Sequence, residues 1–162
     1  MAPLNPTAQR VQAAADALGL DIEVLELAQS TRTAQEAALA VGCDLAQITK
    51  SLVFRGNDTG AAYLLLVSGA NRVNEKTMAN GDLGSIGEKL ERPDAQFVRD
   101  VTGFAIGGIP PFGHIKRLAT YIDETLMVYD RVWAAAGTPN ALFSVAPRAL
   151  AEATRATAIS VG

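Results

Sequence analysis

A lysine stands among large apolar residues in the run Ile48–Arg55, which reads ITKSLVFR. If this run is a strand, successive side chains point to opposite faces, so Lys50 shares a face with Leu52 and Phe54. An ammonium group on such a face either reaches water at the start of the strand or lines a pocket where it can bind a polar ligand. The strand pattern alone leaves both interpretations open.

A second candidate element is the glycine- and proline-rich run Thr102–Thr120, TGFAIGGIPPFGHIKRLAT. Glycines permit backbone conformations closed to other residues, whereas prolines fix φ and stiffen the chain. Such a loop can direct the N–H groups of Gly107, Gly108 and Ile109 to one point, where they would bind an anion or a developing oxyanion. The same composition also suits a tight connection between two elements, and the loop alone does not decide between the two.

The composition excludes several kinds of chemistry. His114 is the only histidine and Cys43 the only cysteine, so a His-rich metal site, a Cys-x-x-Cys redox pair and an internal disulfide are not available. No phosphate-binding P-loop, dinucleotide fingerprint or Gly-x-Ser-x-Gly nucleophile motif is present. We therefore predict neither a metal nor a cofactor. His114 could act as a general base, but nothing near it in the sequence orients it, which favours a side chain at the edge of the loop.

The charge and hydropathy pattern limits the partners. A formal net charge of −3 argues against a general nucleic-acid coat protein, because such binding needs many Lys and Arg contacts to phosphate. Lys116-Arg117 is the tightest basic candidate. The N-terminus lacks a secretory signal, and the longest apolar run, 61–67, is far shorter than the ~20 residues that span a bilayer. We predict a cytoplasmic protein with no membrane contact.

The periodicity and the turn residues predict a single domain over residues 1–162, of the α+β (mixed α/β) class. We expect a curled, largely antiparallel or mixed sheet flanked by helices. Helical segments are predicted at 7–18, 33–42, 74–80, 85–90 and 94–100 and from Pro147. Strands are predicted at 22–27, 50–54 and 62–68, the last two as a hairpin, and further apolar segments follow at 118–122, 126–129, 132–135 and 142–145.

The segment Thr102–Asp123 resembles the YbaK/prolyl-tRNA synthetase insertion-domain family of aminoacyl-tRNA deacylases. The Gly-x-x-x-Pro loop of that family is matched by Gly107 to Pro111, with a further glycine at Gly113. The family also has a lysine at the start of a strand, after a short helix and a turn, and Lys50 in VGCDLAQITKSLVFR is similar to it. The two motifs lie far apart and in the family's order, and the resemblance runs loosely over residues 7–150.

The resemblance implies a freestanding trans-editing hydrolase that cleaves the ester of a mischarged small amino acid from tRNA, with tRNA for proline as one candidate. It implies that Lys50 points into the pocket and helps to hold the 3′-terminal adenosine. Gly107 and Gly108 would present backbone groups in a substrate-assisted reaction, which needs a placed water and a stabilised oxyanion but no side-chain nucleophile. Delivery by an aminoacyl-tRNA synthetase or an elongation factor would compensate for the low basicity. The other residues expected to bind substrate are Ile109, Pro110, Pro111, Gly113, His114, Phe54 and Ser68.

The sequence departs from the family pattern in one place. Cysteinyl-specific members carry a Gly-basic-basic-Gly-Leu-Asp run, whereas this chain reads GTPNAL over 137–142, with Leu142 in the acidic position. This weakens the case for a cysteinyl substrate and leaves the amino acid open. Two alternatives remain: a non-catalytic module of the same fold that binds the tRNA end or adenosine, and a hydrolase of another small acyl ester. The oligomeric state is not predicted.

Overall fold

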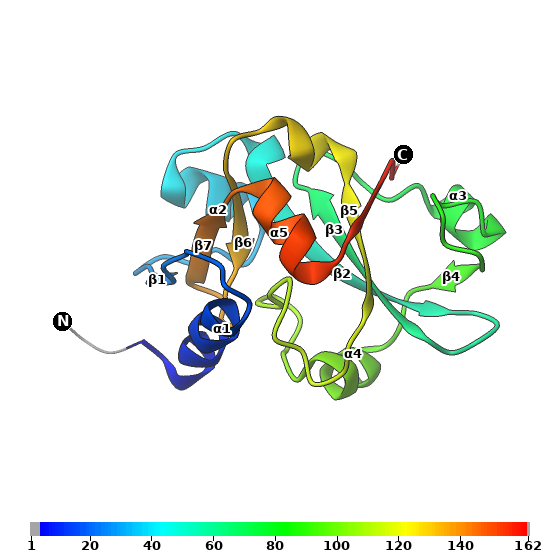
Figure 1. Cartoon of the computed structure of the whole chain (residues 1–162), viewed down its shortest axis with the longest axis horizontal. Coiled ribbons are helices and arrows are strands. Elements are labelled where there is room, and N and C mark those ends of the chain that lie inside the picture. Colours follow the sequence, from blue (N-terminus) through cyan, green and yellow to red (C-terminus); the bar gives the residue numbers. More distant parts are fainter. Residues whose placement is uncertain (1–3, 162) are drawn as a thin grey trace.

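The computed structural model describes residues 4–161, whose strands form one mixed sheet in the order β1-β7-β6-β2-β3-β5-β8, with β4 pairing with β2 (Figure 1). The strands are β1 (Leu25–Glu26), β2 (Ile48–Gly56), β3 (Ala62–Ser68), β4 (Leu90–Glu91), β5 (Ala119–Asp123), β6 (Val132–Ala135), β7 (Ala141–Val145) and β8 (Thr157–Ile159). The helices are α1 (Pro6–Ala17), α2 (Ala34–Val41), α3 (Glu75–Asn80), α4 (Ala95–Thr102) and α5 (Pro147–Thr154), with 3₁₀ helices η1 (Leu45–Gln47) and η2 (Glu124–Val128).

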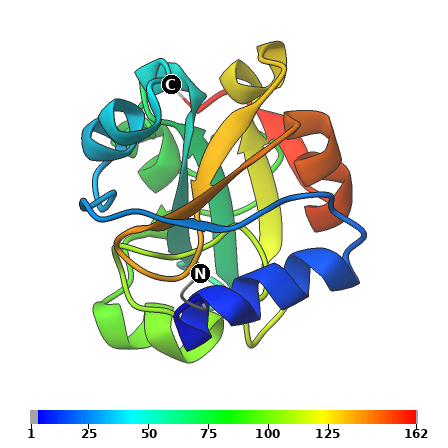
Figure 2. The same ribbon diagram turned by 90° about the vertical axis from the view of Figure 1, so that its left-hand side faces the viewer.

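Both faces of the sheet are covered because the central strands are apolar on both sides. Leu64 and Leu66 of β3 lie in a core cluster with residues of α1, α4 and α5, and Figure 2 shows α1 along the lower edge of the sheet and α5 beside it. Leu65 and Val67 point to the other face and pack with α3 and the segment that follows it. A third cluster joins α2 to β2 and β7. The predicted mixed α/β architecture is confirmed: three of the strand pairings are parallel and four antiparallel.

The predicted helix boundaries are confirmed where a cap sets them. The Thr33 hydroxyl accepts a hydrogen bond from Glu36 N (3.1 Å), and the Glu36 carboxylate accepts one from Thr33 N (3.2 Å), as a capping box requires. Gly42 then ends α2 in the left-handed conformation, with φ +71°. Helices α1, α3, α4 and α5 also lie where the sequence places them, as does the hairpin of β2 and β3.

The prediction of a strand over 22–27 is wrong for most of its length. Only Leu25–Glu26 pairs, with β7. The backbone of residues 22–24 forms hydrogen bonds with the side chain of Gln12 instead. Gln12 Nε2 donates to Ile22 O (3.0 Å), and Gln12 Oε1 accepts from Val24 N (2.9 Å). A glutamine on α1 therefore takes the place of a neighbouring strand.

The helix predicted over 85–90 is also wrong, because this segment forms turns that end in β4. Its Glu88 carboxylate binds the tip of the β2–β3 hairpin. One oxygen accepts from Asp58 N and Thr59 N (3.1 Å each), and the other from Thr59 Oγ1 (2.8 Å) and Tyr63 Oη (2.5 Å). These hydrogen bonds, led by that from Tyr63, lower the pKa of Glu88 to about 2. Two other differences are smaller: 126–129 lies mostly in η2, and β8 was not predicted.

We predict that Glu88→Gln destabilises the fold at neutral pH but makes it less sensitive to acid. The depressed pKa means that the Glu88 carboxylate contributes stability above its ordinary value of 4.5, and that this contribution is lost as the pH falls toward 2. Urea unfolding between pH 7 and pH 2.5 should show the gap between wild type and variant closing as the pH falls. A gap that stays constant over this range would contradict the assignment.

Candidate functional site

Strand β2 lacks a partner along the middle of one edge. On one side it pairs with β3 from Thr49 to Arg55. On the other side β6 pairs only with residues 48–49, and β4 only with residues 55–56. The sheet therefore opens between β6 and β4, beside residues 50–54 of β2.

The direction of the backbone groups along this opening follows from two hydrogen bonds. Ile48 O accepts from Gly69 N (2.7 Å), and Gly56 N donates to Ala61 O (2.8 Å). The even-numbered residues of β2 thus bond to the β3 side, because antiparallel partners alternate in this way. Ser51 consequently directs its N–H and C=O toward the opening.

A cavity of about 540 Å³ is lined by this part of β2, a volume in the usual range for small-ligand sites. No carboxylate lines it, and its charged lining residues are two cations, Lys50 and Arg32. Within residues 4–161 no cluster of His, Cys, Asp or Glu could hold a metal ion, and no helix is long and apolar enough to cross a bilayer. The lining comes from 31–34 and Ala37 around the start of α2, 48–52 of β2, 106–109 of the glycine- and proline-rich run 102–120 (the glycine loop), 133–135 of β6 and Leu142 of β7.

Lys50 is half-buried at this cavity and is held by a backbone carbonyl. Its Nζ donates to Asn71 O at 2.6 Å. Because an ammonium group has three N–H donors, two remain without a partner in the described part of the chain. Burial lowers the pKa of Lys50, and Arg72 lowers it further, whereas the Asp123 carboxylate acts in the opposite direction. Lys50 is thus a partly desolvated cation that keeps donors for a ligand.

Asp123, at the end of β5, fixes the turn that holds Lys50. This carboxylate is 1% exposed. Its Oδ2 accepts from Asn71 Nδ2 (2.9 Å) and from Ser68 N (3.1 Å), and its Oδ1 accepts from Thr125 N (3.0 Å). The buried charge therefore positions Asn71, whose carbonyl binds the ammonium of Lys50. Neither Asp123 nor Asn71 was singled out from the sequence, where they lie far from each other.

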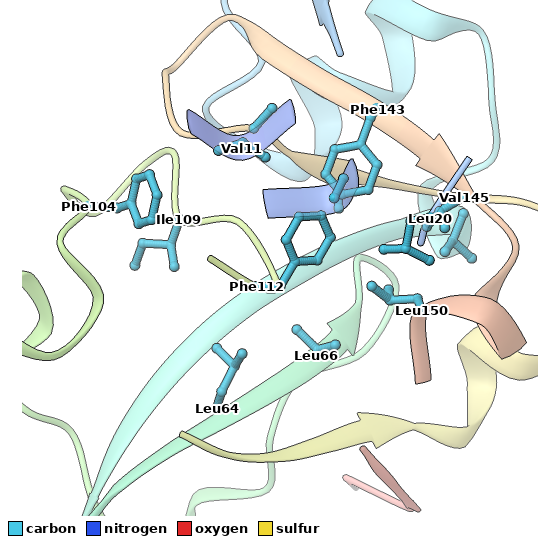
Figure 3. Packing of buried hydrophobic residues seen from close by; sticks show 14 of the residues in the cluster. Val11, Leu20, Leu64, Leu66, Phe104, Ile109, Phe112, Phe143, Val145 and Leu150 are labelled. Carbon is cyan, nitrogen blue, oxygen red and sulfur yellow. The ribbon is translucent and has the colours of Figure 1, made fainter. Parts of the chain in front are cut away.

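The glycine loop is anchored in the core on both sides of its prolines. Ile109 packs beside Phe104, and Phe112 meets Phe143 of β7 with ring centroids 5.5 Å apart (Figure 3). The N–H of Gly108, one of the three donors predicted to converge, instead donates to Ala105 O at 3.3 Å. Those of Gly107 and Ile109 have no partner among residues 4–161. Gly107 and Ile109 thus keep backbone donors beside the cavity.

Gly107 and Gly108 of this loop are required for different reasons. Gly107 has φ +103°, which side chains rarely adopt, and a Cβ there would lie 3.3 Å from Arg32 Nε. A Cβ on Gly108 would lie 2.9 Å from the carbonyl carbon of Gly137. Gly108 O also accepts from Gly137 N at 2.8 Å. The run 137–142, where the sequence departs from the cysteinyl-specific pattern, thus contacts the glycine loop directly, and Leu142 lines the cavity.

Two buried hydroxyls at the cavity were missed by the sequence analysis. Thr49 and Ser51 point to the face of β2 opposite Lys50, and neither hydroxyl has a hydrogen-bond partner within the described residues. Thr49 is only 4% exposed. A buried polar group without a partner costs about 1–3 kcal/mol, so these two hydroxyls lower the stability of this part of the strand. The polar residues at 49 and 51 in the alternating pattern of β2 could have identified these hydroxyls from the sequence. Nothing in the sequence marks Arg32 or Thr31 as residues of the cavity.

The predicted site residues fall into three groups. Lys50, Gly107, Gly108 and Ile109 line the cavity. Phe54 is 1% exposed in the cluster under α3, and the fully buried Ser68 donates from Oγ to Ala46 O (2.7 Å), so the structure places both outside the cavity lining. Pro110 is buried, and a second cavity on the same loop is lined by Pro111, Gly113 and His114.

His114 has a structural partner. Its Nε2 lies 2.7 Å from Pro110 O, which can only accept, so Nε2 carries the proton. Burial lowers the pKa of His114 and thus favours the neutral imidazole. No carboxylate of the described chain hydrogen-bonds to it.

We predict that Asp123→Asn lowers the pKa of Lys50. The negative charge of Asp123 favours the protonated amine, so its removal makes the proton easier to lose. NMR titration of labelled lysine side chains measures this shift. Glu124→Gln is the matched control, because Glu124 is the adjacent residue but is exposed and therefore screened. Equal shifts in the two variants would contradict the role given to the buried carboxylate.

Comparisons of the whole chain with known proteins identify its family. Residues 28–153 match the family described as "Aminoacyl-tRNA editing domain". The chain belongs to this family, and the resemblance inferred from the lysine and glycine-loop motifs is confirmed.

Two relatives and one crystal structure are similar to this chain. The chain is 30% identical to "Uncharacterized protein YwhH" of Bacillus subtilis over 130 residues, an alignment that covers 80% of each protein. It is 28% identical over 118 residues to "Putative Cys-tRNA(Pro)/Cys-tRNA(Cys) deacylase EbsC" of Enterococcus faecalis, covering 73% of this chain and 70% of that protein. A crystal structure described as "a putative trans-editing enzyme for prolyl tRNA synthetase" superposes with a TM-score of 0.86 at 47% identity, over 99% of this chain and 100% of that one.

Proposed function

We propose that this protein is a trans-editing hydrolase that removes a mischarged small amino acid from tRNA by cleaving its ester bond. One observation carries the proposal: Lys50 and the glycine loop, 57 residues apart at Gly107, line the same cavity. Membership of the editing-domain family supports it, as do the names of the Enterococcus faecalis relative and of the crystal structure given above. Delivery of the substrate by an aminoacyl-tRNA synthetase or an elongation factor is part of the proposal.

The charges of the cavity suit the end of a tRNA. Lys50 and Arg32 are its charged lining residues, so a phosphate or ribose oxygen meets donors and no repelling carboxylate. We assign to Lys50 the role of holding the terminal nucleotide, through the N–H donors that Asn71 leaves free. Because the ammonium is already positioned by Asn71, little ordering remains to be done when the substrate binds.

The glycine loop suits ester hydrolysis without a side-chain nucleophile. The tetrahedral oxyanion formed by attack of water needs preorganised donors, each of which contributes on the order of 10²–10³ in rate. We assign this role to the N–H groups of Gly107 and Ile109, since that of Gly108 donates to Ala105 O. Gly108 contributes by its lack of a side chain, which lets the loop lie against Gly137.

The walls of the cavity suit a small side chain. Ala37, Ala134 and Leu142 are apolar and buried, and Leu142 stands where cysteinyl-specific relatives carry an acidic residue. This favours alanine or another small amino acid over cysteine. One methylene changes binding by only about 1–3 kcal/mol, so discrimination among small amino acids has to come from shape as well as from polarity.

The deciding experiment is deacylation of tRNAs carrying Ala, Cys, Ser, Thr or Pro. We expect wild type to clear one mischarged species and Lys50→Ala to lose about 10- to 100-fold in rate, because a hydrogen bond to a charged group contributes about 1.5–3 kcal/mol. Lys89→Ala, an exposed lysine outside the cavity, should retain full activity. If wild type clears none while still binding tRNA, the protein is instead a binding module of the same fold.

We predict that Gly108→Ala lowers the deacylation rate by at least about tenfold. The added Cβ would meet the backbone of Gly137 and Thr138 at 2.9 Å, so the loop has to shift, and small misplacements of reacting groups are costly. Gly87→Ala is the matched control, since no atom lies within 4 Å of its Cβ position and its φ is not positive. Equal activity of the two variants would remove the glycine loop from the mechanism.

A further inference from the structure

A second cavity is lined by the C-terminal part of the glycine loop, whose N-terminal part lines the first cavity. Its volume is about 500 Å³. Residues 106–109 of the loop line the first cavity, whereas residues 111–118 line the second, so one loop separates the two. The remaining walls of the second cavity are Leu18 after α1, Thr120 of β5 and residues 153–155 at the end of α5.

This second cavity concentrates positive charge on a protein with a net charge of −3. Its lining includes three permanent cations, Lys116, Arg117 and Arg155, and no aspartate or glutamate. Within residues 4–161 the ion pairs are Arg55–Glu91 and Arg92–Glu75, so none of the three is neutralised by a carboxylate. All three are exposed. A cavity with unpaired cations and no acidic wall is complementary to an anion.

Arg155 reaches this cavity from an unfavourable backbone conformation. It follows α5 with φ 55° and ψ 38°, and it is the one non-glycine residue with positive φ in the described chain. All the other positive-φ positions of the described residues are glycines. An arginine that keeps this conformation, where glycine would be more stable, is the kind of local strain that accompanies a functional position.

We propose that this basic cavity, lined by Lys116, Arg117 and Arg155, binds phosphodiester groups of the tRNA backbone while the aminoacylated end occupies the first cavity. The inference rests on the proposed function, because it takes tRNA as the substrate. Phosphate contacts position a nucleic acid without reading its sequence. Two cavities on one loop give the protein two points of attachment, so the acceptor arm is held in register with the glycine loop.

The proposal is tested by binding of uncharged tRNA, measured by fluorescence anisotropy over a range of salt concentrations. The Lys116→Ala/Arg117→Ala variant should lower the slope of log K against log salt by about two, since each phosphate contact contributes about one. Arg155→Gly should lower it by about one. Because glycine adopts the left-handed conformation freely, Arg155→Gly should keep or raise the melting temperature, which separates loss of binding from loss of folding.

Lys76→Ala is the charge-matched control, on α3 and outside both cavities, and it should leave the salt slope unchanged (Figure 1). In deacylation, the variants of the basic cavity should raise KM for aminoacyl-tRNA but leave KM for an aminoacylated CCA trinucleotide unchanged, because the short substrate cannot reach the second cavity.

Each result bears on one proposal or the other. Unchanged salt slopes in all the basic-cavity variants overturn the phosphate-binding role, whether or not the protein deacylates tRNA. Binding of inorganic phosphate at Lys116 and Arg117 in NMR titration, with tRNA affinity unaffected by the substitutions, likewise overturns it, since the cavity would then be a site for free anions. If the basic-cavity variants lower the salt slope but the wild-type protein deacylates no tRNA, the phosphate-binding role is supported and the hydrolase function is refuted.

Discussion

The site depends on the unpaired middle of β2. A strand in the interior of a sheet normally satisfies its backbone on both edges, but β6 leaves β2 after residue 49 and β4 joins only at residue 55. The opening is stable because β3 pairs along the whole of the other edge and both of its faces are buried. Backbone groups of β2 and the Lys50 side chain thus remain available to a ligand beside the opening in the sheet.

The electrostatics of Lys50 follow from the same arrangement. Direct pairing with a carboxylate would occupy the ammonium and raise its pKa, whereas the contact with Asn71 O holds it in place at little cost to its ability to bind. The buried Asp123 carboxylate positions Asn71 by accepting a hydrogen bond from its Nδ2, so it does not itself bind the ammonium of Lys50. A cation that is oriented but not neutralised suits a ligand that carries its own negative charge.

Much of the fold could be predicted from local chemistry. The capping box at Thr33, the stop at Gly42 and the turn between β2 and β3 each depend on residues near one another in the chain, and these elements lie where they were expected. The failures depend on distant partners. Gln12 replaces a strand beside Ile22, and the hairpin tip binds Glu88 in a segment that looks helical by itself.

The candidate site divides in the same way. Lys50 and Gly107 could be found because their residue types are unusual for their surroundings and match a known pair of motifs. Asp123, Asn71 and Arg32 could not, since ordinary polar residues acquire a role only when the chain brings them together. Phe54 was expected to bind substrate and shares a face with Lys50, but it packs in the cluster that α3 covers.

The contact between Gly108 and Gly137 limits how this protein can diverge. The turn at 137–140 leads into Leu142, which borders the cavity, and its first amide is bonded to the carbonyl of the glycine loop. A lineage that lengthens or reshapes this turn to admit a different amino acid also moves the loop proposed to carry out hydrolysis. Substrate preference and turnover therefore cannot drift independently, and redesign of the pocket has to treat the two segments as one unit.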